Sequence, residues 1–467
     1  MMSKSKLSGY KEATVPFGLP DRATCEAGKY LGSRIKIVAL FIICLVLGSM
    51  PVHAADVVLI HAGKLLAVPG QAPQANKTIV VSKGRIVEIR DGFVTVDGLQ
   101  LSDGQTAATV DLSESFVLPG LMDAHVHLMW SGRDHPPKKQ GGGSTGQQSQ
   151  LNKEGLTLWT LRHARTTLAS GFTTVREMAS EPNVMFAVRD WINGGKFIGP
   201  RILAAGQPVT AAGGHGDNAG ADSAPDGLDS SGLCDGLESC RRAVRIQHKR
   251  GSDVIKMMST GGFSDHTGTE QFFFYDEMEA TVHAAHQLGL AVATHAYAGD
   301  AIADAVRAGV DSVEHGFGAT DATLKEMQKK NIYLVPTLSV AQRKGAGTTL
   351  YREKHHAFER ALDIGTPIAF GSDVGGIPHR YAAREFLYMV NLGMSPAAAI
   401  VSATINTAKL FRLENEVGTI EPGKLADIIA VNGNPLEDIE SLQEISFVMK
   451  SGRVAKQNGV MKNIFLD

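Results

Sequence analysis

Between residues 116 and 373 the chain repeats short apolar runs that have the composition of buried strands. Helical runs rich in Ala, Glu, Arg and Leu separate several of them, as at 275–288 and 299–308. Eight strand candidates with such crossovers predict an α/β fold, namely a (β/α)8 TIM barrel. The candidates are 116–118, 172–176, 201–205, 253–258, 291–295, 312–315, 332–335 and 367–373.

The two ends of the chain that follow residue 54 have a different pattern. Residues 55–117 and 411–467 hold short apolar runs separated by Gly, Asp and Asn, which is typical of short antiparallel strands. We therefore expect both ends to form one small β-sandwich beside a barrel that spans residues 118–410. A chain of 467 residues with 43% hydrophobic residues is long enough to fill both cores.

The first 54 residues predict export. Arg34 and Lys36 precede the apolar stretch 37–47, and a Val-x-Ala sequence ends at Ala54, as in a secretory signal peptide. The apolar stretch is too short for a comfortable membrane span. We therefore expect a periplasmic or secreted protein with no stable membrane span after cleavage. The alternative is an anchor that is not cleaved.

Cysteine content and net charge further restrict the kind of protein that this sequence can encode. Only Cys234 and Cys240 follow residue 54, and in an oxidising compartment they could form a local disulfide. The alternative is a pair of free thiols at the start of a helix. The formal net charge of −2 shows no basic excess, so nothing indicates nucleic-acid binding.

A His-x-His pair, His125 and His127, follows the first strand candidate. Side chains alternate along a strand, so both imidazoles lie on one face and can aim at one point. Neutral imidazole nitrogens suit zinc, although such a pair also occurs on solvated strands. Further candidate ligands stand at the ends of later strands, where the active sites of barrels lie: Lys256, His295, His315 and Asp373.

Lys256 is the unusual member of this set. It stands in an apolar strand candidate, where burial lowers the pKa of an amine and favours its neutral form. A neutral amine can add carbon dioxide and become a carbamate, whose two oxygens can bridge two cations. Each residue also has a plainer alternative: a snorkelling or ion-paired Lys256, satisfied core histidines at His295 and His315, and a helix cap at Asp373.

His215 is a candidate of a different kind, because it stands in a loop. The sequence Gly213-Gly-His-Gly-Asp217 follows the third strand candidate, and a loop at that position must lie on the active face of a barrel. The alternative is a solvated loop histidine.

Taken together, these motifs resemble the amidohydrolase superfamily across essentially all of the chain after residue 54. The segments 253–262 and 213–217 are most similar to its Xaa-Pro dipeptidase and imidazolonepropionase-like branch. The residues that carry the resemblance are Pro119-Gly-Leu-Met-Asp-Ala-His-Val-His127, Lys256, His295, Glu314-His-Gly316, Gly371-Ser-Asp373 and the stretch 418–427.

The resemblance implies a binuclear zinc site bridged by a carboxylated Lys256. We expect an amide carbonyl to be attacked by a hydroxide that bridges the two divalent metals. Asp373 would then carry the proton to the leaving amine, and His215 would contact the substrate carbonyl. The expected ligands are His125, His127 and Asp373 for one metal and His295 and His315 for the other.

The expected substrate is a small amide, most simply a dipeptide or an N-acyl amino acid. Its carboxylate needs a cation, and Arg176 and Arg380 lie near strand ends. Tyr275 is a further candidate contact, although the stretch Gln271-Phe-Phe-Phe-Tyr275 departs from relatives that carry a tyrosine shortly before this helix. We also expect a homo-oligomer.

Two other hypotheses assume the same barrel fold. In the second, the same site acts on a cyclic amide, as in imidazolonepropionase-like relatives, or on an amide-linked toxin such as ochratoxin. In the third, the chain is a metal-free binding or scaffold protein. The presence of all six candidate ligands argues against it.

Overall fold

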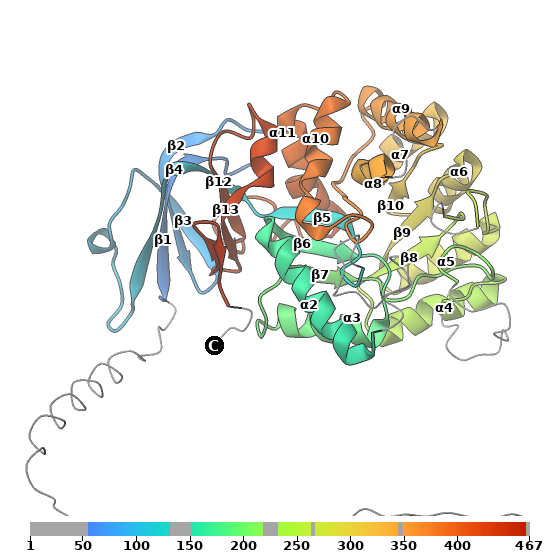
Figure 1. The fold of residues 1–467 in the computed structure, drawn as a ribbon, viewed down its shortest axis with the longest axis horizontal. Helices are drawn as coiled ribbons and strands as arrows, with labels where there is room; N and C mark the ends of the chain where they lie inside the picture. Colours follow the sequence, from blue (N-terminus) through green and yellow to red (C-terminus); the bar gives the residue numbers. More distant parts are fainter. Residues whose placement is uncertain (1–54, 131–150, 218–231, 263–266, 344–348, 464–467) are drawn as a thin grey trace, which may run out of the picture. The chain divides into compact units, whose positions relative to one another are not determined.

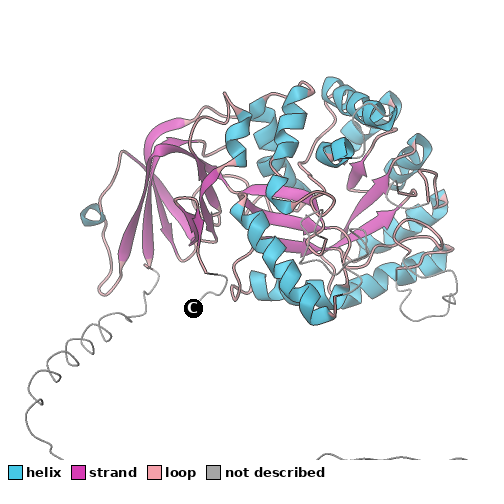
Figure 2. Cartoon of the chain, viewed as in Figure 1, coloured by secondary structure: helices cyan, strands magenta, loops and turns pink. Residues whose placement is uncertain are grey.

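The computed structural model describes residues 55–130, 151–217, 232–262, 267–343 and 349–463. These residues form the mixed α/β fold that the sequence predicts, with helices packed around strands (Figure 1, Figure 2). The expected signal peptide lies in residues 1–54, outside the described residues, so export stays a prediction.

One eight-stranded sheet combines strands from both ends of the described chain. Inside it, β4 (Ala107–Pro119) pairs antiparallel with β12 (Ile428–Val431). Residues from both parts share one apolar core, as the two layers of a sandwich would, with Ile60 and Phe447 among its members. The other strands are β1 (Val57–Leu65), β2 (Gln74–Ser82), β3 (Arg85–Asp91), β13 (Ile445–Lys450), β14 (Arg453–Gln457) and β15 (Val460–Met461), and the order is β15-β14-β13-β12-β4-β1-β2-β3.

Parallel strands form two further sheets, and most of these strands are buried along their whole length. Such burial suits strands that helices cover on the outside. One sheet holds β5 (Leu121–Val126), β6 (Phe172–Glu177) and β7 (Arg201–Ala204), and the other holds β8 (Val254–Met258), β9 (Ala291–Ala296), β10 (Ser312–His315) and β11 (Tyr333–Val335).

Isolated parallel bridges link these two sheets at both ends. Val209 after β7 pairs with Met257 of β8, Leu334 of β11 pairs with Ile368, and Val374 pairs with Val126 of β5. The expected eighth strand, 367–373, therefore forms single bridges instead of a ladder. Its backbone enters the left-handed region at Asp373, where φ is +56°, and the bridge to β5 follows at Val374. The bridges follow the cyclic order that the predicted barrel would have.

The first barrel strand lies later in the chain than the sequence predicts. Residues 116–118 belong to β4 of the eight-stranded sheet, and the first strand of the barrel is β5, which carries His125. The chain passes from one sheet to the other at Gly120, where a Cβ atom would lie 2.2 Å from Thr173 Oγ1. Only a glycine fits this crossing.

The helices begin and end where the sequence supplies caps. Asn152 accepts a hydrogen bond from the Gly155 amide at the start of α2, and glycines in the left-handed conformation end α4 and α6. Within the part of the chain that the structure describes, no helix combines the length and the apolar character needed to cross a membrane. The helices are α2 (Lys153–Ala169), α3 (Pro182–Asn193), α4 (Leu237–Arg250), α5 (Tyr275–Gln287), α6 (Gly299–Ala308), α7 (Asp321–Lys330), α8 (Leu338–Arg343), α9 (Thr349–Ile364), α10 (Arg384–Asn391), α11 (Pro396–Val401) and α12 (Thr407–Leu410), with short turns η1 (Val96–Gly98), η3 (His379–Tyr381), η4 (Ser402–Asn406) and η5 (Ile439–Gln443).

Cys234 and Cys240 form a disulfide, which decides the alternative that the sequence leaves open. Both residues are fully buried at the start of α4. The Cys234 amide donates to the Thr210 carbonyl (2.9 Å), and the Thr210 hydroxyl donates to the His215 carbonyl (2.9 Å). The disulfide therefore anchors the segment that holds the loop of His215.

Replacing both cysteines with alanine should lower the free energy of unfolding by about 2 kcal/mol, because the cross-link closes a short loop and restricts the unfolded chain. Denaturant unfolding with and without reductant measures this. Reductant should shift the wild-type midpoint and leave the double variant unchanged. Equal shifts for both proteins would contradict the assignment.

Candidate metal centre

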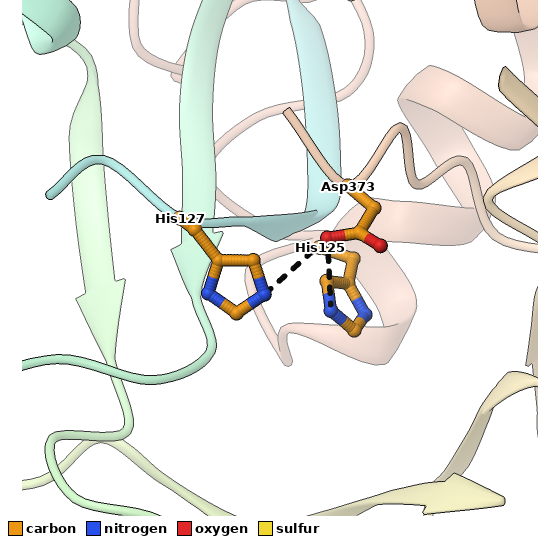
Figure 3. A group of neighbouring side chains, drawn as sticks. All are labelled: His125, His127 and Asp373. Carbon is orange, nitrogen blue, oxygen red and sulfur yellow. Dashed lines mark ion pairs between the residues drawn. The ribbon is translucent and has the colours of Figure 1, made fainter. Parts of the chain in front are cut away.

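His125, His127 and Asp373 converge at one end of the barrel strands (Figure 3). Asp373 Oδ1 lies 3.3 Å from His127 Nε2 and 3.8 Å from His125 Nε2. One ligand atom from each of the three residues lies within 4.8 Å of the other two. Two imidazole nitrogens and a carboxylate oxygen in this spacing fit a divalent metal such as zinc.

Backbone contacts hold these three residues together. The Asp373 amide donates to the His125 carbonyl (2.8 Å), which fixes the left-handed turn against β5. Two glycines make the close approach possible. A Cβ on Gly371 would lie 2.2 Å from Val335 Cγ1, and one on Gly375 would lie 2.5 Å from the His127 carbonyl oxygen.

His295 and His315 form a second group that adjoins the first. His295 lies near the end of β9 and His315 ends β10, with ring centroids 4.7 Å apart. The His315 ring is 5.1 Å from the His125 ring. Burial lowers the pKa of all three imidazoles well below the usual value, and the positive charge of Lys256 adds to this. They are therefore neutral, as metal ligation requires.

Lys256 occupies the middle of β8 and is 1% exposed. Burial lowers the pKa of its amine to about 8, against the opposing charges of Glu314 and Asp373. Among the residues that the structure describes, no acceptor hydrogen-bonds the Lys256 amine. The snorkelling alternative does not fit a side chain this buried, and the site lowers the pKa in the direction that favours carbamate formation.

A carboxylate behind His125 orients that ring, and sequence reasoning gave it no role of its own. Glu314 Oε2 lies 2.6 Å from His125 Nδ1, which sets the proton on Nδ1 and leaves Nε2 free to bind a metal. Glu177 Oε1 lies 3.9 Å from His127 Nδ1, which is too far for a hydrogen bond. The signal for Glu314 was its position beside His315 in a short buried strand.

Arg176 was expected to bind the substrate carboxylate, but its guanidinium forms an ion pair with Glu314. Its Nη2 lies 2.8 Å from Glu314 Oε1, and its Nε donates to the Ala124 carbonyl (2.8 Å). The side chain points into the barrel interior from β6 and is 1% exposed. It therefore supports His125 through Glu314 and has no free edge for a substrate carboxylate.

Thr337 and Lys354 support His315 and were also missed. The Thr337 hydroxyl lies 2.7 Å from His315 Nδ1, and the buried Lys354 amine donates to the Thr337 carbonyl and hydroxyl. Lys354 is on α9, a helix with many polar residues, so nothing in the local pattern marks it as buried. Asp123 ties the two chain segments together, because it accepts from the amides of His125 (3.0 Å) and Ser372 (3.1 Å).

The structure brings His215 to the second group. Its ring centroid lies 4.6 Å from that of His295, and its side chain is half-buried. A Cβ on Gly262 would lie 2.4 Å from His215 Nδ1, so this glycine leaves room for the ring. An aromatic wall completes this side, with Tyr297 4.4 Å from the His295 ring and Phe317 4.5 Å from Tyr297.

The Tyr275 side chain is turned toward a neighbouring helix. Its hydroxyl donates to Glu279 (3.0 Å), and the guanidinium of Arg307 on α6 covers its ring at 3.5 Å. These contacts do not support the expected substrate contact at Tyr275, which stays a prediction. Arg380 is exposed on η3, with its guanidinium 4.5 Å from the Tyr381 ring.

Comparison with known proteins agrees with this geometry. The chain is 29% identical over 440 residues to ochratoxinase from Aspergillus niger, covering 87% of this chain and 88% of that protein. It is 25% identical to imidazolonepropionase from Symbiobacterium thermophilum over 446 residues, covering 87% and 99%. The crystal structure of a Xaa-Pro dipeptidase with methionine bound in the active site matches with a TM-score of 0.76 and 36% identity, covering 86% of this chain and all of that one.

The family match covers most of the chain. The model of the amidohydrolase family aligns with residues 116–455, which include every candidate ligand and the whole segment between β4 and β14. The chain therefore belongs to the amidohydrolase family and is a hydrolytic enzyme.

Proposed function

We propose that this enzyme cleaves the amide bond of dipeptides or N-acyl amino acids with two zinc ions. The observation that carries the proposal is the meeting of two ligand groups. His125, His127 and Asp373 lie within 4.8 Å of one another, and the His315 ring is 5.1 Å from His125. The charge of Lys256 acts on histidines of both groups. In the proposal, this residue would carry a carbamate and serve both groups as a shared ligand.

The residues around this centre would have different catalytic roles. Divalent ions held by these ligands would polarise the amide carbonyl and lower the pKa of a water molecule. Asp373 accepts the proton of the attacking water and delivers it to the leaving amine. His215, beside His295, donates a hydrogen bond to the carbonyl oxygen as its negative charge develops. Lys256 adds carbon dioxide and releases a proton, which converts a buried amine into an anion.

The proposed substrate class rests on the similar proteins and on the arginine proposed to bind the substrate carboxylate. A Xaa-Pro dipeptidase with bound methionine and an ochratoxinase share the fold over most of the chain. Arg176 is paired with Glu314, and we retain Arg380 as the proposed contact for the substrate carboxylate. The imidazolonepropionase relative favours a cyclic amide as the second candidate.

A substrate screen with zinc and bicarbonate supplied tests the proposal. The arms are dipeptides, N-acyl amino acids, imidazolonepropionate and ochratoxin. We expect turnover of the linear substrates, and dipeptide amides without a free carboxylate should react at least about tenfold more slowly, since one charge-assisted contact is lost. Turnover of cyclic amides alone would contradict the dipeptidase assignment, but it would not contradict the proposed metal site.

Chelation tests the metals separately. Exhaustive chelation should abolish turnover and lower Tm, since a ligand that binds only the folded state stabilises it. Zinc should restore both, with two equivalents of metal bound per chain. Full activity at zero metal content would overturn the proposed chemistry.

We further propose that residues 1–54 direct export and that the mature enzyme is a homo-oligomer. The N-terminal sequence of the protein purified from its own cell envelope and its native mass test these two points. A retained first segment would contradict cleavage, and a monomeric mass would contradict assembly.

A further inference from the structure

A cavity of about 260 Å³ lies between the barrel helices and the eight-stranded sheet. Arg201, the first residue of β7, reaches its edge through a hydrogen bond to Ser451 (3.1 Å). The candidate metal ligands stand at the opposite, carboxyl ends of the barrel strands. The cavity is therefore separate from the candidate metal centre. Its apolar walls are Leu168, Ile192, Phe197, Ile198, Val454 and Ala455.

Two cations line this cavity from adjacent strands. Lys450 on β13 pairs directly with Arg453 on β14 across the Ser451-Gly452 turn. Val448 and Ala455 pack into the barrel core, and each lies two residues from one of these cations. Lys450 and Arg453 both line the cavity, so both face the space between the sheet and the helices. Like charges directly opposite one another destabilise a sheet.

Neither cation forms an ion pair with a carboxylate in the described residues, and the charge of Asp427 offsets that of Lys450 only in part. Asp427 is the nearby acid, but it forms an ion pair with Arg201 (2.7 Å) and accepts from the Ser451 amide (2.7 Å). Arg453 donates to the Gly195 carbonyl (3.2 Å). Within the described ranges, neither Lys450 nor Arg453 has an ion-pair partner, and no acceptor hydrogen-bonds the Lys450 amine. Burial lowers the pKa of Lys450 to about 8, so it stays mostly protonated at neutral pH.

We propose that this cavity binds a small organic carboxylate with an apolar body. The carboxylate lies between Lys450 and Arg453 and offsets their repulsion, while the body contacts the apolar walls. A volume of about 260 Å³ corresponds to roughly nine water molecules in the liquid, which suits an acid with a single ring. This inference does not depend on the proposed substrate.

The test uses three probes: 3-phenylpropionate, the neutral alcohol 3-phenylpropanol, and inorganic phosphate. Binding to the full-length protein is measured by calorimetry and by the shift in Tm. We expect saturable binding of 3-phenylpropionate, at least about tenfold tighter than that of the alcohol or phosphate, which is about 1.4 kcal/mol. Absence of binding, or equal binding of phosphate or the alcohol, would overturn the proposal.

Variants locate the site. Lys450→Gln/Arg453→Gln should bind 3-phenylpropionate at least about tenfold more weakly, with an unliganded Tm equal to or above that of the wild type, because the repulsion is removed. Lys64→Gln, which changes an exposed lysine of the same sheet, is the matched control and should bind as the wild type does. Ala455→Leu, which fills the cavity and keeps both cations, should also weaken binding. Unchanged binding to the double variant would place the probe elsewhere and overturn the assignment.

Discussion

Lys256→Ala should lower kcat/KM by about 10³-fold or more. Lys256 is the proposed bridge between the two ligand groups, and a metal site that lost its bridging anion would lose several kcal/mol of transition-state stabilisation. Each 1.36 kcal/mol corresponds to a factor of about ten in rate. The measurement is kcat/KM on the best substrate of the screen, with metal content determined on the same samples, where we expect fewer than two equivalents.

Matched variants separate chemistry from packing. Lys256→Met keeps most of the buried volume and should be as inactive as Lys256→Ala. Lys354→Met removes another buried lysine, whose amine hydrogen-bonds Thr337, which in turn contacts His315. Loss of such an indirect support costs about 10- to 100-fold, so this variant should stay well above both Lys256 variants. Unchanged activity after Lys256→Ala would refute the binuclear mechanism.

Arg176→Met should destabilise the fold by about 3–5 kcal/mol. The substitution leaves the Glu314 carboxylate fully buried without its ion-pair partner, and an uncompensated buried charge is strongly destabilising. The free energy of unfolding from denaturant titration measures the loss. Arg85→Met, which breaks an exposed pair with Glu416, is the matched control and should cost less than about 1 kcal/mol.

A second substitution distinguishes this role from substrate binding. Arg176→Met/Glu314→Gln removes both charges and should recover part of the lost stability, which a double-mutant cycle detects. A substrate-binding Arg176 would instead give a variant of wild-type stability with a raised KM. That result would restore the role that the sequence suggests for this residue.

The local pattern identified most of the secondary structure because apolar runs and crossovers carry that information. It misplaced the start of the barrel. Residues 116–118 are as apolar as a barrel strand, but Gly120 turns the chain between two sheets, and composition alone does not show to which sheet an apolar run pairs. It also predicted a regular strand at 367–373, where the structure has an isolated bridge at Ile368 and another just beyond the segment at Val374.

The meeting of His125, His127 and Asp373 could be predicted because metal-binding residue types recur at strand ends. The residues that support the histidines could not be predicted. Glu314 and Thr337 contact histidines, and Lys354 contacts Thr337, from positions that follow no spacing rule. The partners of Arg176 and Tyr275 could not be predicted for the same reason, since charge or ring chemistry near a strand or helix end does not reveal the partner that the side chain meets.

The sequence by itself determined the fold class, the amidohydrolase motifs and the identity of the candidate ligands, because alternation and strand-end position are local properties of the chain. Only the tertiary structure decided which charges face one another. It joined Arg176 to Glu314 across the barrel, closed the disulfide, and set Lys450 opposite Arg453 beside a cavity. These outcomes depend on contacts between residues far apart in sequence and on burial, which alters the energy of a charge according to what surrounds it.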